Sequence, residues 1–210
     1  TLPGAGAWRS GEALADLVAL TPDLWWLDLP GQPGNGLCCT WLVNTRSRHA
    51  MVVHWRIASE AEAGAEPRVQ QHFASGRLVS DGLPPDGDAP APTRDLIGLR
   101  TWQTYSPQHV YEHTYLSSQR YAWQCLVGVQ RGHGDVDLAS YHRFAPDVYV
   151  FAFREYRIPV ASLFVFDFQG LRSTGKFLGL TTEGQPEHRM AGAHIDIASR
   201  THYSKGFSPI

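Results

Sequence analysis

Three features of the sequence predict an all-β protein whose antiparallel strands close into an up-and-down barrel. Short runs rich in Tyr, Trp, Phe and Val follow one another through the second half of the chain. Their side chains alternate in character from one residue to the next, as expected of half-buried strands. The segments between them have the length of hairpin connections, which join antiparallel neighbours. Closure into a barrel would remove the exposed edges that such strands otherwise present.

The predicted strands occupy most of the chain after residue 23. In the first half they are Leu24–Leu29, Leu37–Asn44, His49–Ile57 and a weaker Val69–Val79. In the second half they are His109–Leu116, Tyr121–Val129, Asp137–Phe144, Val148–Tyr156, Val160–Phe168 and a weaker Lys176–Leu180. A meander of this kind predicts a barrel of the lipocalin-like (calycin) type.

A short helix is expected before the first strand. Leu14, Leu17 and Val18 lie at helical spacing within residues 11–20, and Pro22 ends the pattern.

We expect one domain over residues 1–210, because all-β barrels often reach this length without dividing. Residues 81–94 are rich in Pro, Gly and Asp, which predicts a long loop within that domain. Residues 185–210 look polar and without period, and we expect a tail there.

Composition and charge restrict the class of partner. A net charge of −2 provides no basic field for nucleic acid or an anionic membrane. No apolar run approaches the roughly 20 residues of a membrane helix, and no signal-peptide pattern is recognised. The three cysteines, Cys38, Cys39 and Cys125, do not form a disulfide framework. We therefore expect a cytoplasmic protein with reduced thiols that binds neither nucleic acid nor membrane.

The segment from His109 to His113 matches H-x-x-E-H, the inverted pattern of some zinc peptidases. That chemistry requires a helix, on which positions four apart reach one metal. The surrounding Val110, Tyr111 and Thr114 favour a strand, on which such positions lie about 13 Å apart. We therefore predict no metal site at this motif.

The segment from Gly170 to Lys176 imitates a phosphate-binding loop, G-x-x-x-x-G-K. Phe177 stands where a Ser or Thr would hold Mg²⁺, and the residues after it do not begin a helix. A turn between two strands is the better interpretation.

The alternation places rings and imidazoles on shared strand faces. Tyr111, His113 and Tyr115 would share one face, and Glu112 the other. Further strands carry comparable sets, which are Tyr121, Trp123 and Cys125; Asp137, Ala139 and Tyr141; and Tyr149, Phe151, Phe153 and Glu155. An interior that is apolar in body but carries hydroxyl, indole and imidazole groups is typical of ligand pockets. The same residues could instead interlock as a solid core, and which face points inward is left open.

Several ionisable residues accompany these apolar segments. Arg154 and Glu155 are neighbours on a strand, so their side chains point to opposite faces. A carboxylate in an apolar barrel would have a raised pKa and could exchange protons. Glu112 could do so only if it faces inward in place of His113.

Motifs within residues 100–180 resemble the MoaF-like family (molybdenum cofactor biosynthesis protein F and relatives). They comprise Tyr105–Ser106–Pro107, Tyr111–Glu112–His113, Arg120–Tyr121 with Trp123–Gln124–Cys125–Leu126 and Gly128, Phe153–Arg154–Glu155 before Pro159, and Thr174–Gly175–Lys176 with Gly179. The resemblance implies a calycin-type barrel and implies less about activity. The chain departs from the family pattern where Phe153 replaces Trp, Tyr156 and Arg157 stand in place of Lys, and Val160 replaces Thr. These departures suggest a different ligand.

Two functions remain open from the sequence. The first is a cofactor-independent lyase or isomerase/cyclase that acts on a small hydrophobic, aromatic or polyketide-like compound. The second is a non-catalytic binding or carrier protein for such a ligand, and a homodimer is compatible with either. Candidate catalytic residues are His113, Tyr115, Arg154 and Glu155. Candidate ligand-binding residues are Tyr111, Trp123, Tyr141, Phe151 and Phe153.

Overall fold

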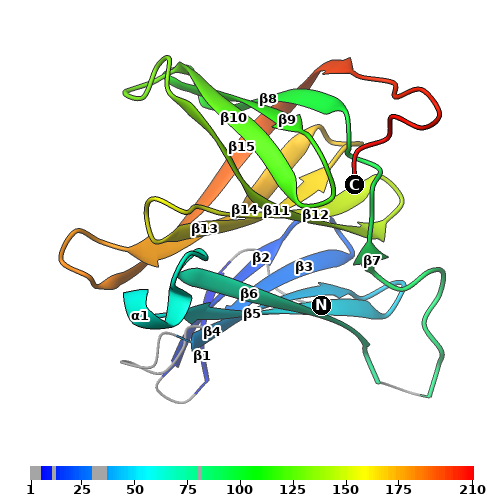
Figure 1. Cartoon of the computed structure of the whole chain (residues 1–210). Coiled ribbons are helices and arrows are strands. Elements are labelled where there is room, and N and C mark those ends of the chain that lie inside the picture. Colours follow the sequence, from blue (N-terminus) through cyan, green and yellow to red (C-terminus); the bar gives the residue numbers. More distant parts are fainter. Residues whose placement is uncertain (1–5, 11–12, 30–36, 80–81) are drawn as a thin grey trace. The chain divides into compact units, whose positions relative to one another are not determined.

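The computed structural model describes residues 6–10, 13–29, 37–79 and 82–210 (Figure 1). The chain divides into two compact units, Thr1–Pro90 and Ala91–Ile210. The strands of the first unit form a sheet of their own, and a closed barrel is formed by strands of the second. The sequence predicted a single barrel over residues 1–210 that would include the predicted strands of both halves of the chain.

The described part of the first unit contains a six-stranded antiparallel sheet in which each strand pairs with the next along the chain. Its strands are β1 (Gly6–Ser10), β2 (Ala13–Ala19), β3 (Leu24–Leu29), β4 (Leu37–Asn44), β5 (His49–Ile57) and β6 (Val69–Arg77). The predicted strands from β3 to β6 are confirmed, with β6 ending two residues early.

One face of this sheet buries a short chain of hydrogen bonds. The Thr40 hydroxyl donates to Asp28 Oδ1 over 2.6 Å, and the Trp55 indole donates to that hydroxyl over 3.0 Å. All three side chains are buried. A buried carboxylate without hydrogen-bond partners would lower the stability of the fold. These hydrogen bonds therefore allow Asp28 to lie in the interior of the sheet.

The helix predicted over residues 11–20 is wrong. Residues 13–19 form β2, which pairs with β3 from Asp16 opposite Asp28 to Ala19 opposite Trp25, while residues 11–12 lie outside the described part. The helical spacing of three apolar residues was a weak local preference, and pairing with β3 overrides it because each strand residue then gains inter-strand hydrogen bonds.

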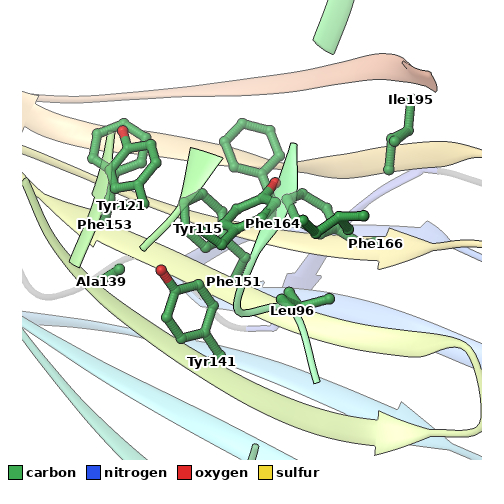
Figure 2. Packing of buried hydrophobic residues seen from close by; sticks show 11 residues of the cluster. Leu96, Tyr115, Tyr121, Ala139, Tyr141, Phe151, Phe153, Phe164, Phe166 and Ile195 are labelled. Carbon is green, nitrogen blue, oxygen red and sulfur yellow. The ribbon is translucent and has the colours of Figure 1, made fainter. Parts of the chain in front are cut away.

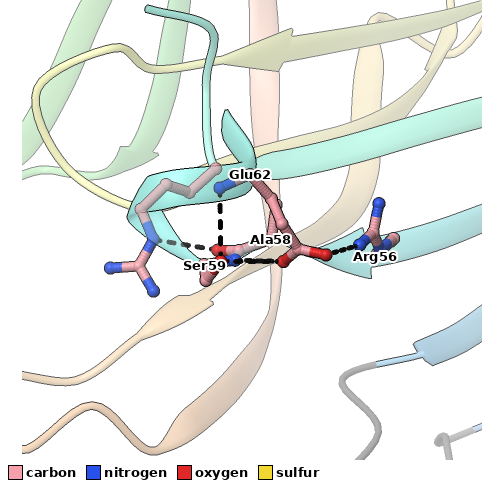
Figure 3. Close-up of polar contacts among 5 residues, drawn as sticks. Arg56, Ala58, Ser59 and Glu62 are labelled. Atoms are coloured by element: carbon pink, nitrogen blue, oxygen red, sulfur yellow. Dashed lines mark hydrogen bonds and ion pairs between the residues drawn. The ribbon is translucent and has the colours of Figure 1, made fainter. Parts of the chain in front are cut away.

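A single-turn helix, α1 (Glu60–Ala63), connects β5 to β6 (Figure 3). Ser59 caps it: its hydroxyl accepts from Glu62 N, and Glu62 Oε2 accepts from Ser59 N over 2.9 Å. Glu62 also pairs with Arg56 on β5. This reciprocal arrangement satisfies two backbone donors that the start of a helix leaves free.

No helix within the described ranges has the length and hydropathy that would be needed to cross a membrane.

The second unit, all of which is described, forms an eight-stranded antiparallel barrel (Figure 1). Its strands are β8 (Leu99–Ser106), β9 (His109–Tyr115), β10 (Arg120–Val127), β11 (Gly134–Ala145), β12 (Val148–Arg154), β13 (Val160–Asp167), β14 (Arg172–Leu180) and β15 (Pro186–Arg200). The two-residue strand β7 (Ala91–Pro92) adds to the edge of β11.

Sequential pairing closes this barrel. Each strand pairs with the next along the chain, and this includes β10 with β11. The ring is closed by β15, which pairs with β8 from His194 opposite Thr104 to Arg200 opposite Leu99. The all-β, up-and-down antiparallel barrel expected from the sequence is therefore confirmed.

Two strands of the barrel were missed by sequence reasoning. β8 carries Thr101 and Gln103 on its inner face, and these polar residues interrupt the apolar alternation on which the prediction relied. β15 occupies most of the segment 185–210 that was expected to be a tail. Its inner row of Ala191, Ala193 and Ile195 has the period of a strand, but the small alanines made it inconspicuous.

The inward row of each strand builds an aromatic core (Figure 2). Phe151 lies at its centre, with ring centroids 5.0 Å from Tyr121, 5.3 Å from Phe166 and 5.4 Å from Tyr115. Tyr121 also stacks on Phe153 at 5.2 Å. The prediction left the inward face open, and the structure places the aromatic face inside.

Gly175 lies where β13 and β14 approach each other closely. It pairs with Phe164 in the middle of β14, so the G-x-x-x-x-G-K segment runs into a strand and forms no phosphate loop. A Cβ at Gly175 would lie 2.0 Å from the Leu163 carbonyl oxygen and 2.7 Å from Phe164 Cα. Both are backbone atoms that cannot move without separating the strands.

We expect Gly175→Ala to destabilise the protein by about 2–3 kcal/mol, because the methyl group overpacks a backbone contact. Thermal unfolding checks this against Gly76→Ala, whose added Cβ meets nothing within 4 Å and should change stability by less than about 0.5 kcal/mol. Equal unfolding midpoints for the two variants would contradict the close approach.

Candidate functional site

A cavity of about 470 Å³ lies within the barrel unit. Its lining residues come from the end of the barrel that carries the β8–β9, β10–β11, β12–β13 and β14–β15 connections. They are Tyr105, His109, Tyr111, His113, Tyr121, Trp123, Gln130, Phe153, Glu155, Phe177, Arg189, Met190 and Ala191. The size is within the usual range of small-molecule sites, and the walls are mainly aromatic with few polar groups, as such sites usually are.

Aromatic rings form the wall on several strands. Tyr111 on β9 lies 6.0 Å from both Tyr105 on β8 and Trp123 on β10, measured between ring centroids. Phe177 on β14 lies 6.5 Å from Tyr105 and 6.1 Å from Phe153. Flat apolar walls of this kind favour a flat, ring-containing ligand.

His113 is the most unusual polar group in the cavity. Only 5% of the residue is exposed, and its ring lies 5.3 Å from that of Tyr121 and 5.8 Å from that of Phe151. Its Nδ1 has no hydrogen-bond partner among the residues that the structure describes. Burial lowers the pKa of His113 to about 3, so the imidazole is neutral at physiological pH. An unpartnered buried nitrogen costs stability, and a ligand that bonds to it would recover that cost.

Glu155 is the titratable carboxylate of the cavity. It follows β12 directly, and burial raises its pKa to about 7, with Asp137 and Asp135 adding negative charge nearby. Asp137 accepts from the Trp123 indole over 2.9 Å, so it also fixes one wall of the cavity. A carboxylate with a pKa near neutrality can both hold and release a proton under physiological conditions.

Two cavity tyrosines keep their hydroxyls free, whereas the other phenols nearby are engaged. Tyr111 donates to Gln130 Oε1 over 2.9 Å, which fixes its ring at the entrance. The interactions found for the phenols of Tyr105 and Tyr121 in the described part of the chain include no hydrogen bond. Burial raises the pKa of both phenols, so they remain protonated donors.

The structure brings together five residues that the sequence analysis had selected. His113 and Glu155, proposed as catalytic, and Tyr111, Trp123 and Phe153, proposed as ligand-binding, all line the cavity. The regular strand alternation made this possible, because one inward residue on a strand implies the next but one. Their roles stay predictions.

Three further candidates lie beneath the cavity. Tyr115, Tyr141 and Phe151 are nearly fully buried in the aromatic core and are not among the lining residues. The Tyr115 hydroxyl lies 3.4 Å from Thr101 Oγ1, and the Tyr141 hydroxyl donates to the Arg120 carbonyl oxygen over 2.9 Å. These hydroxyls support the cavity floor and do not project into the open space.

Arg154 and Glu112 point to the opposite face of their strands. Arg154 donates to Ser140 Oγ over 3.1 Å, away from the row formed by Phe151 and Phe153. Glu112 accepts from Arg100, whose Nη2 lies 2.6 Å from Oε2. With His113 inside, Glu112 is therefore outside, which settles the alternative that the sequence left open.

The other eight lining residues were not selected as site residues, although Tyr121 and Phe177 lie within predicted strands. Tyr105, Arg189, Met190 and Ala191 lie on the two strands that were not predicted, and His109 and Gln130 lie beside turns. The motif His109–His113 is a strand, as predicted, and both imidazoles line the cavity from one face of β9. Within residues 91–210, no three His, Cys, Asp or Glu side chains bring ligand atoms within 4.8 Å of one another.

We expect His113→Phe to be at least as stable as the parent chain at pH 7, and relatively more stable as the pH falls. The folded pKa of His113 lies below its unfolded value near 6.5, so the unfolded state binds the extra proton and stability is lost between about pH 6.5 and pH 3. This loss can reach about 1.4 kcal/mol per pH unit. Unfolding midpoints at pH 7 and pH 5 measure it.

His133→Phe, on the exposed β10–β11 connection, is the control for replacing a histidine outside the cavity, and the same two midpoints are measured for it. A parent chain and a His113→Phe variant that lose stability equally on acidification would show that His113 is not held neutral.

Comparisons with known proteins indicate the family to which this chain belongs. Residues 90–201 match the family model described as the MoaF C-terminal domain. Protein MoaF of Klebsiella aerogenes is 36% identical over 183 residues, which cover 82% of this chain and 68% of that protein. A crystal structure of a presumed beta-lactamase from Burkholderia vietnamiensis aligns with 49% of this chain and 95% of its own, at 12% identity and a TM-score of 0.41, which is too low to support an argument. The family model and the relative together show that the chain belongs to the MoaF family.

Proposed function

We propose that the barrel is a cofactor-independent enzyme, a lyase or an isomerase/cyclase, that acts on a small hydrophobic compound with an aromatic or polyketide-like ring system. The observation that carries the proposal is one cavity of about 470 Å³ that combines aromatic walls with Glu155 and the unpartnered His113. A solid core would need neither an open volume nor a buried nitrogen without a partner.

Glu155 is the proton carrier in this proposal. With its pKa near 7, the carboxylate form can remove a proton from a carbon next to a carbonyl group, and the resulting acid can return that proton to a second carbon. The substrate then changes only the position of a double bond, so atoms and electrons balance without a further reactant. The neutral His113 is too weak a base for this step and would orient the substrate by a hydrogen bond.

Native mass spectrometry of the purified chain identifies a co-purified ligand, and incubation with that compound followed by product analysis tests turnover. If turnover occurs, we expect Glu155→Gln to lower kcat by about 10²- to 10⁴-fold, since the amide cannot exchange the proton. The parent rate should rise through a midpoint near pH 7 as the carboxylate forms, and this limb should be absent from the variant.

Glu183→Gln, in the exposed β14–β15 turn, is the matched control and should retain full activity. Undiminished activity of Glu155→Gln would overturn the assignment of Glu155.

The second candidate function is a carrier or sensor that binds the same kind of ligand without changing it. One observation favours it: Tyr115 and Arg154, two of the four residues selected for catalysis, do not line the cavity. This function predicts a tightly retained ligand that is recovered unchanged after long incubation.

A further inference from the structure

We propose that the ligand of this cavity is an uncharged ring compound that carries a hydroxyl group, a phenol or an enol, and that this hydroxyl is held between His113 and the hydroxyls of Tyr121 and Tyr105. The inference rests on the proposed function, because it specifies the compound that the same cavity receives. It follows from which polar groups of the cavity are unpartnered, how deeply they lie, and where the charged groups are.

The deep part of the cavity offers hydrogen bonds and no cation. Tyr121 is 1% exposed and His113 is 5% exposed. His113 Nδ1 is buried without a hydrogen-bond partner in the described part of the chain. The interactions found for the Tyr121 phenol there include no hydrogen bond. A neutral imidazole has one nitrogen that donates and one that accepts. A ligand hydroxyl can do both, so it satisfies His113 in either tautomer and accepts from a tyrosine at the same time.

The distribution of charge disfavours an anionic ligand. Arg189 is the one arginine or lysine among the cavity-lining residues, all of which are described, and its side chain is 76% exposed. Its guanidinium already bonds to Glu187, with Nε and Oε1 2.8 Å apart. Glu155 lines the same cavity, with Asp137 and Asp135 acting on it electrostatically. A carboxylate or phosphate that entered would lose its hydration and meet further negative charge without a buried cation.

A cationic ligand is disfavoured by the neutral groups around the unpartnered nitrogen. An ammonium group only donates, so it cannot accept from the hydroxyls of Tyr105 and Tyr121. Asp137 does not line the cavity, and its carboxylate accepts a hydrogen bond from the indole of Trp123. Glu155 is the group through which a cation could still compete, and for this reason the test includes a cationic probe.

Four naphthalene probes of similar size separate these possibilities by calorimetric titration at pH 8. They are 2-naphthol (uncharged, donor and acceptor), 2-methoxynaphthalene (uncharged, acceptor only), 2-naphthoate (anion) and 2-naphthylmethylamine (cation). We expect 2-naphthol to bind about tenfold tighter than each of the other three, since each loses a hydrogen bond or brings an uncompensated charge.

Variants assign the preference to named atoms. His113→Phe and Tyr121→Phe should each reduce the ratio of 2-naphthol to 2-methoxynaphthalene affinity towards one, while the affinity for 2-methoxynaphthalene is retained. Tyr141→Phe is the matched control, because it removes a hydroxyl that bonds to the Arg120 carbonyl beneath the cavity, and it should leave the ratio unchanged.

The outcomes distinguish the two proposals. Equal or tighter binding of the anion or the cation, or an unchanged ratio in both variants, would overturn the inference about ligand class and leave an aromatic ligand site standing. Failure of all four probes to bind would overturn the proposed function itself.

Discussion

Closure of the barrel through the β10–β11 and β15–β8 pairings is the constraint on which the site depends. Once eight strands are joined in a ring, the pleat sends every second side chain inward and gives each inward residue a fixed neighbour on the next strand. Tyr111, His113 and Tyr115 therefore face the same interior as Tyr121 and Trp123. Aromatic side chains fill one end of that interior as a packed core, and the cavity lies at the other end.

The core and the cavity are two parts of one continuous row of rings. Phe151 and Tyr115 pack tightly at the floor, and Tyr115 is tied into a buried chain through Thr101, Gln103 and Ser173. This chain satisfies polar groups that would otherwise be costly inside a barrel, and it holds the floor rigid. Above the floor the pattern changes, because His113 and Tyr121 have no such partners. A rigid floor beneath unpartnered polar groups is the arrangement expected of a preorganised binding site.

The sequence predicted the barrel and five of the thirteen cavity-lining residues for the same reason. Strong alternation, as from Tyr111 to Tyr115 and from Phe151 to Phe153, indicates both that a segment is a strand and which of its side chains lie on the same face. β8 and β15 could not be found in this way. On β8 the inward Thr101 and Gln103 are polar, and Gln103 Nε2 donates to Thr101 Oγ1 inside the barrel. On β15 the inward Ala191 and Ala193 are small. For residues 13–19 the helix prediction was wrong for a different reason. The apolar residues there have helical spacing, but the segment pairs with β3 as a strand. The sequence also could not show how deep in the barrel each inward side chain lies. Alternation places both Tyr141 and Tyr111 on inward faces, but only the three-dimensional structure shows that Tyr111 lines the cavity and Tyr141 lies beneath it.

We infer that the cavity on the inward face receives a ligand hydroxyl at the unpartnered, neutral imidazole of His113. Long-range ¹H–¹⁵N spectra of the histidine rings, recorded from pH 5 to pH 8 with and without 2-naphthol, test it most directly. We expect that His113 does not titrate over this range and that the signal of its Nδ1 shifts when 2-naphthol is added, while the ring signals of exposed His133 do not respond to the compound. A His113 ring that titrates near pH 6.5, or that does not respond to a bound ring compound, would contradict the account.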